Sequence, residues 1–281
     1  SFFIKGQLLI SKRKEVLLFE YFQKILFVIG AIVCLPLYGF CASPNLDPTT
    51  GFFSSSNLLT TVFYGVLIAV PVLIILLSTV IQKRFAFSIS NSRMLGVLSL
   101  LMGALMIASG VIHLMNLLSS AFSAVMFSTL IITALQIVMA DLSGIVFLHL
   151  GIATFKENIS NRGSLTFLFP LVWALIACVE MFRDYPQIAG MPERTLYLLC
   201  LLSFTLFLMG QSRILSDVDF IKGVRWINAF GMCAALFGLT MTAGEIAEFS
   251  SMSLPVFDVL AGIHPLSVLL WPFSLTPTLK N

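Results

Sequence analysis

The chain has 281 residues, of which 58% are hydrophobic and only 10% carry a charge. A soluble domain carries about 25% charged residues, so this chain does not have enough polar surface to face water on all sides. The formal net charge of +3 is accounted for by Lys and Arg in the segments between apolar runs, so no nucleic-acid partner is expected.

Apolar runs recur along nearly the whole chain, and each is long enough to cross a bilayer as a helix, which takes about 20 residues. In lipid only helices and closed barrels satisfy the backbone polar groups. Barrel strands are alternating segments of about ten residues, whereas these runs are continuous. We therefore expect an all-α, polytopic membrane bundle that forms a single integral membrane domain over residues 1–281. The eight expected spans are 22–42, 58–82, 94–118, 122–150, 165–182, 195–214, 226–248 and 257–275.

Residues 1–21 contain the basic run Lys12, Arg13 and Lys14, which no small-residue cleavage site follows. Apolar sequence instead continues directly into the first span. We expect residues 1–21 to be a basic cytoplasmic lead-in rather than a removed signal peptide.

The distribution of Lys and Arg predicts the orientation of the spans, because these residues favour the cytoplasmic side. With the N-terminus inside, Arg183 and Arg194 are the only two of the 16 basic residues that fall in outer segments. We therefore expect a multi-pass protein of the cell membrane with both termini in the cytoplasm.

The third and seventh spans carry small residues at steps of three and four, which keep them on one helix face. Such residues let membrane helices approach closely. An offset of 132 residues superimposes the two patterns, which suggests two four-helix halves, 22–150 and 165–275, related as a parallel repeat. The competing interpretation is that Gly and Ala are common in all membrane helices. The two seams are Gly96, Ser99, Gly103 and Gly110, and Gly231, Ala235, Gly238 and Thr242.

The repeat makes a specific prediction about helix packing. If the two seams pack against each other, the third and seventh helices cross closely and run parallel. His113 then lies level with Glu245, and a carboxylate beside a histidine stabilises the charged form of both.

Ionisable side chains gather near the predicted outer ends of several spans. Such a group inside a span costs about 2.5–3.5 kcal/mol, so each one needs a reason. We interpret them as an outward-facing polar layer that binds a proton, an ion or a ligand; the competing interpretation is that they cap helix ends at headgroup depth. The layer consists of His113, Glu180, Glu245, Glu248 and His264.

Asp141 differs from this layer because it lies near the middle of the fourth span. A carboxylate at that depth faces the bundle interior and either pairs with another group or binds a proton or cation. We expect its side chain to face protein or an internal cavity and never the lipid. The competing interpretation is a protonated Asp141 that bonds to a neighbouring helix.

The sequence contains no GxGxxG, P-loop, HExxH or GxSxG motif, and its five cysteines form no CxxC pair. We therefore expect no catalytic residues and no metal site, and no cofactor is indicated. The first expectation is a non-catalytic accessory or sensor protein that binds a ligand or partner; the second is a small-molecule or ion transporter or channel; the third is an intramembrane enzyme. The expected partners are the lipid bilayer and a membrane protein or second copy of this chain.

Overall fold

A computed structural model describes residues 22–39, 58–81, 93–120, 127–156, 166–188, 192–215 and 218–249. Within these residues the regular structure consists of seven helices and no strands. They are the Phe22–Gly39 helix, α2 (Leu58–Ile81), α3 (Arg93–Ser120), α4 (Phe127–Phe155), α5 (Leu168–Ile188), α6 (Pro192–Leu215) and α7 (Phe220–Phe249). The lead-in and the eighth expected span, 257–275, lie outside the described residues.

Six of these helices are long and apolar enough to cross a membrane, so the chain is a multi-pass α-helical membrane protein. The exception is α5, whose apolar part, Leu168–Glu180, is shorter. Glu180 is followed in α5 by Arg183 and Asp184, which lower the hydropathy of the second half of the helix. The expected number of eight spans is therefore not reached within the described part of the chain.

The observed bounds of α4 differ most from the expected span of 122–150. The helix runs from Phe127 to Phe155, so its C-terminal end lies five residues later than expected. The residues after His149 continue the helix because Leu150 and Thr154 are buried, and the Thr154 hydroxyl donates a hydrogen bond to the Leu150 carbonyl at 2.8 Å.

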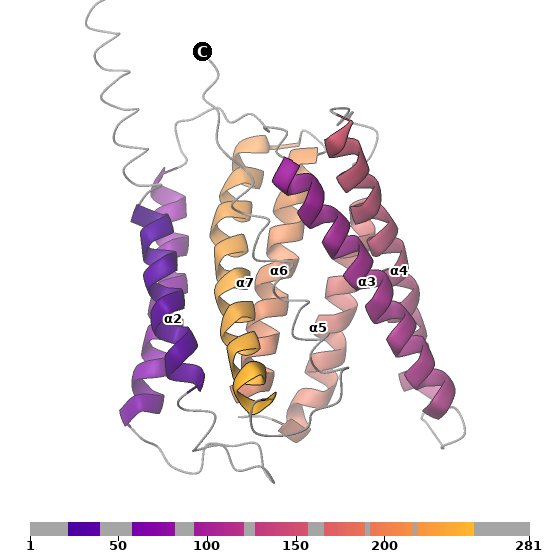
Figure 1. The fold of residues 1–281 in the computed structure, drawn as a ribbon, viewed down its shortest axis with the longest axis horizontal. Coiled ribbons are helices and arrows are strands. Elements are labelled where there is room, and N and C mark those ends of the chain that lie inside the picture. Colours follow the sequence, from indigo (N-terminus) through magenta and orange to yellow (C-terminus); the bar gives the residue numbers. More distant parts are fainter. Residues whose placement is uncertain are drawn as a thin grey trace, which may run out of the picture.

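The helices form a bundle in which successive helices run in opposite directions (Figure 1). The Phe22–Gly39 helix and α2 lie at one edge, α3 and α4 lie at the other, and α6 and α7 lie between them (Figure 1). Among α2 to α7, the most extensive contacts join α3 to α4 and α6 to α7, with smaller contacts between α4 and α5, α5 and α6, and α2 and α7. Within α2 to α7, the α3–α4 and α6–α7 hairpins are thus the most tightly packed pairs.

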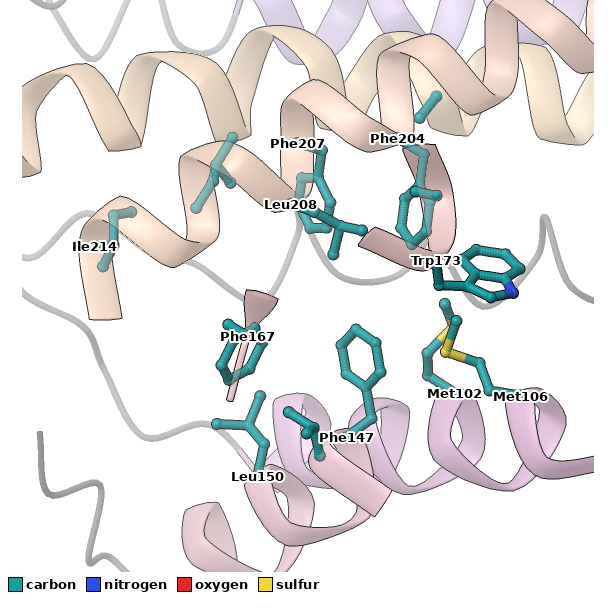
Figure 2. Packing of buried hydrophobic residues seen from close by; sticks show 14 of the residues in the cluster. Met102, Met106, Phe147, Leu150, Phe167, Trp173, Phe204, Phe207, Leu208 and Ile214 are labelled. Carbon is teal, nitrogen blue, oxygen red and sulfur yellow. The ribbon is translucent and has the colours of Figure 1, made fainter. Parts of the chain in front are cut away.

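One hydrophobic cluster joins α3 and α4 to α5, α6 and α7 (Figure 2). Aromatic rings make up much of it: Trp173 of α5 meets Phe204 of α6 edge-to-face, with ring centroids 6.4 Å apart, and Phe204 stacks on Phe207 at 5.9 Å. Met102 and Met106 of α3 fill the space beside Trp173 (Figure 2). Flexible methionine side chains suit such irregular gaps.

A second cluster joins the Phe22–Gly39 helix and α2 to α6 and α7. The neighbouring residues Ala234 and Ala235 of α7 are both fully buried, yet Ala234 belongs to the first cluster and Ala235 to the second. In the α7 span 67% of the residues are buried, against 28% in the α4 span. Helix α7 therefore contributes residues to both clusters.

A buried polar contact joins the Phe22–Gly39 helix to α2. The Gln23 amide donates a hydrogen bond to the Ser78 hydroxyl at 2.5 Å and lies 3.4 Å from the Ile74 carbonyl. Gln23 and Ser78 are 2% and 1% exposed, so this contact is shielded from both water and lipid. Hydrogen bonds between membrane helices hold them together where apolar burial gives no preference for protein over lipid.

The small residues of α3 pack against α4, and the expected crossing of α3 with α7 is wrong for the residues described. A Cβ added at Gly103 would lie 2.7 Å from the Gly144 carbonyl oxygen, and one at Gly151 would lie 2.9 Å from the Gly96 carbonyl oxygen. The reason is that α4 carries two glycines seven residues apart, Gly144 and Gly151. In the antiparallel α3–α4 hairpin, Gly144 lies against Gly103 and Gly151 lies against Gly96.

The seam on α7 meets other helices. Gly231 and Ala235 are buried, and Ala235 packs in the cluster that includes α2 and α6. In a parallel repeat the counterpart of the α3–α4 contact would join α7 to the span at 257–275, which is not described. The repeat therefore stays a prediction.

Candidate functional site: a carboxylate between α3 and α4

Asp141 lies at the midpoint of α4, fourteen residues after Phe127 and fourteen before Phe155. Its side chain is turned toward α3. A Cβ added at Gly110 would lie 3.0 Å from Asp141 Cγ and would overlap Oδ1. The carboxyl group therefore occupies the space that a side chain at position 110 would need.

The spacing of glycines explains why α3 has room for this carboxyl group. Gly96, Gly103 and Gly110 follow one another at intervals of seven, so they lie along one line on α3. The first two meet Gly151 and Gly144 of α4 at close range. At the third position, Gly110, the nearest atoms are those of the Asp141 side chain instead of the α4 backbone.

One oxygen of Asp141 has no hydrogen-bond partner. Oδ1 is buried, and no donor reaches it from the residues that the structure describes. The nearest hydroxyl along α4, that of Ser143, is already committed because it donates to the Met139 carbonyl of its own helix. A buried acceptor without a donor costs about 1–3 kcal/mol, so Oδ1 is a position at which a cation or a hydrogen-bond donor would be stabilised.

On one side of Asp141 the neighbouring residues are buried in the bundle, and on the other side they are exposed on its surface. Met106, one turn before Gly110, is fully buried, as is Ala140. Val138 and Ile145, three residues before and four after Asp141 and hence on its side of α4, are 52% and 58% exposed. The half-buried Asp141 thus lies at the edge of the α3–α4 interface, next to the surface of the bundle.

Of the predicted polar layer, the structure describes the side chains of His113 and Glu180 alone, so the layer stays a prediction. His113 is exposed on α3, and Glu180 is half-buried on α5. Glu245 and Glu248 lie in the last turns of α7, but their side chains are not described, and His264 lies outside the described residues. The predicted pairing of His113 with Glu245 therefore stays a prediction.

The remaining seam residues are placed as follows. Ser99 is fully buried on α3, Gly238 is buried on α7, and the side chain of Thr242 is not described. Across the described residues no three His, Cys, Asp or Glu side chains come together as a metal site.

Sequence reasoning missed the contact between Gly110 and Asp141, although both residues were singled out separately. The available signal was the matching interval of seven in Gly96 and Gly103 and in Gly144 and Gly151, which fixes the register of an antiparallel hairpin. Comparisons with protein-family models, curated proteins and solved structures found no match.

Proposed function

We propose that the chain is a non-catalytic membrane protein that binds a partner or ligand within the membrane, and that Asp141 is the group on which binding depends. The observation that carries this proposal is the buried Oδ1 of Asp141, which lies against Gly110 with no donor from the described residues. A partner group that donates a hydrogen bond, or that carries a positive charge, would satisfy this oxygen.

The position of Asp141 favours binding of a partner over passage through the bundle. The spans of α3 and α4 are only 33% and 28% buried, so this hairpin forms an outer edge of the described bundle. Asp141 borders the exposed side chains of Val138 and Ile145. A helix that lies along this strip can bring a Lys, Arg or amide group to the carboxylate, where lipid would otherwise leave it unpaired.

A photo-crosslinking amino acid at position 145 tests this proposal in intact membranes. Ile145 is 58% exposed one turn from Asp141 on α4, and Val179 is exposed to the same extent on a different helix, α5, so position 179 is the matched control. We expect a discrete adduct from position 145 that is absent from position 179 and is lost in Asp141→Asn. An adduct that persists in Asp141→Asn, or equal adducts from both positions, would contradict the proposal.

The second candidate is a transporter or channel in which Asp141 carries a proton or a small cation, and its depth at the midpoint of α4 favours this candidate. The two functions separate in proteoliposomes. Proton or sodium flux that Asp141→Asn abolishes, without a specific adduct from position 145, would assign transport instead.

A further inference from the structure

Four β-branched residues follow one another along α4 at intervals of seven: Ile131, Val138, Ile145 and Ile152. Their side chains are between 47% and 58% exposed. An interval of seven brings side chains back to one helix face, and such a row forms the seam along which two helices pack with a left-handed crossing. We call these four residues the α4 seam.

The α4 seam lies on a different face of the helix from the contact with α3. Gly144 and Gly151, which meet α3, each directly precede a seam residue. One residue turns an α-helix by about 100°, so the seam points away from α3. Figure 1 shows α4 at the edge of the bundle, where a further helix has room to lie along it.

Two polar side chains flank the seam within the apolar span Leu130–Phe155. Asp141 is half-buried four residues before Ile145, and His149 is exposed four residues after it. Ionisable side chains are costly in contact with lipid, and within a span they face protein or water as a rule. The seam therefore presents a polar group on each side of Ile145 that lipid cannot satisfy.

The carboxyl group of Asp141 is within reach of a donor on the seam side. Its Oδ1 is buried against Gly110, but the residue as a whole is only half-buried and lies one turn from the exposed Ile145. The last torsion of an Asp side chain is broad and two-fold, so rotation about Cβ–Cγ turns either oxygen toward the seam. A donor on the seam side thus meets the carboxyl group without entering the α3–α4 interface.

His149 calls for a different group from Asp141. A neutral imidazole has one donor and one acceptor, so a hydroxyl or a carboxamide satisfies it. Asp141 and His149 are eight residues apart, about 12 Å along α4. Residues seven apart on a facing helix share one face and are separated by about 10.5 Å, and the length of the imidazole side chain covers the difference.

We propose that the α4 seam binds a single transmembrane helix that carries two polar groups seven residues apart. A Lys, Arg or amide meets Asp141, and a hydroxyl or carboxamide meets His149. The inference rests on the proposed function, to which it adds the register of the partner and a second contact.

A second copy of this chain does not fit the seam. Two copies with the same orientation in the membrane are related by an axis along the membrane normal, so equivalent residues lie at equal depth. Asp141 would then face the depth of another Asp141, and His149 that of another His149. Like groups would meet instead of complementary ones.

The test measures energy transfer between the full chain, reconstituted in vesicles, and trace amounts of labelled transmembrane peptides. The probes are an all-leucine peptide, one with a central lysine, and two that add threonines on both sides of this lysine, seven or three residues away. Hydrogen bonds between membrane helices change association by about threefold to tenfold. We expect the lysine to strengthen association about tenfold, threonines at seven residues to add about threefold, and threonines at three residues to add nothing.

His149→Leu should remove the gain from the threonines and keep the gain from the lysine, whereas Asp141→Asn should remove the gain from the lysine. His113→Leu is the matched control, because His113 is an exposed histidine on α3, and it should change neither gain.

The two-contact helix is overturned if threonines at seven residues add nothing, if both spacings add equally, or if His113→Leu acts like His149→Leu. Binding at Asp141 survives each of these results. Absence of any gain from the lysine contradicts the proposed function itself. The comparison of the two spacings uses wild type alone, so the test stays decisive even if His149→Leu fails to fold.

Discussion

At the residue scale, the position of Asp141 depends on the missing side chain at Gly110. Its carboxyl group fills that space, so residues 110 and 141 are coupled sterically. The sequence predicts that Asp141 lies at mid-membrane, because depth follows from counting residues along a span. It does not predict the partner, because the register between two helices depends on how all their side chains fit together.

This coupling predicts a non-additive pair of substitutions. Gly110→Ala places a methyl group onto the Asp141 carboxyl and should destabilise the protein by about 1–3 kcal/mol, a typical cost of overpacking. In an Asp141→Ala background the clash is gone, so the same change should be neutral or stabilising by about 0.5–1 kcal/mol, as is usual for Gly to Ala in a helix. Unfolding by SDS in mixed micelles measures both values.

The control for this cycle is Gly65→Ala in α2, since nothing lies within 4 Å of a Cβ at that position. It should not destabilise the protein. Equal costs for Gly110→Ala with and without Asp141 would show that the two residues do not touch.

At the element scale, hydropathy predicts which segments form helices, and six of those described are long and apolar enough to cross a membrane. It predicts neighbours poorly, as the seam of α3 shows. Periodic small residues indicate that a helix has a close neighbour, but they do not identify it. Gly103 would fit against any helix that offers a small residue at the point of contact. Gly144, on the next helix along the chain, provides it at the least cost in chain entropy.

The pairing of the Phe22–Gly39 helix with α2 can be tested at the Gln23–Ser78 contact. Ser78→Ala removes the closer of the two acceptors of the buried Gln23 amide and should lower the free energy of unfolding by about 1–2 kcal/mol. The neighbouring variant Thr79→Ala is the control, because Thr79 is exposed and its hydroxyl bonds only to the Leu76 carbonyl of its own helix. Equal effects of the two substitutions would show that the Gln23–Ser78 hydrogen bond does not stabilise this interface.

At the scale of the whole molecule, the orientation rests on Lys and Arg in the connecting segments. The fold alone does not orient the bundle, because the same packing serves either direction in the membrane. The charge bias predicts that both termini are cytoplasmic.

Single cysteines introduced into a cysteine-free background test this orientation. An impermeant thiol reagent added from outside should label positions 50 and 190 but not positions 88, 160 and 219. Labelling at 160 without labelling at 190 would reverse the orientation.

The sharing of α7 by both clusters has a consequence for synthesis. Phe63 and Ile74 of α2 are fully buried, and their cluster includes Met232 of α7, which follows the end of α2 at Ile81 by 151 residues. At about 5–20 residues per second, the ribosome adds Met232 about 8–30 s after α2 is complete. During that interval the face of α2 that packs in this cluster must be covered by lipid or by the insertion machinery, and α7 displaces that cover when it arrives.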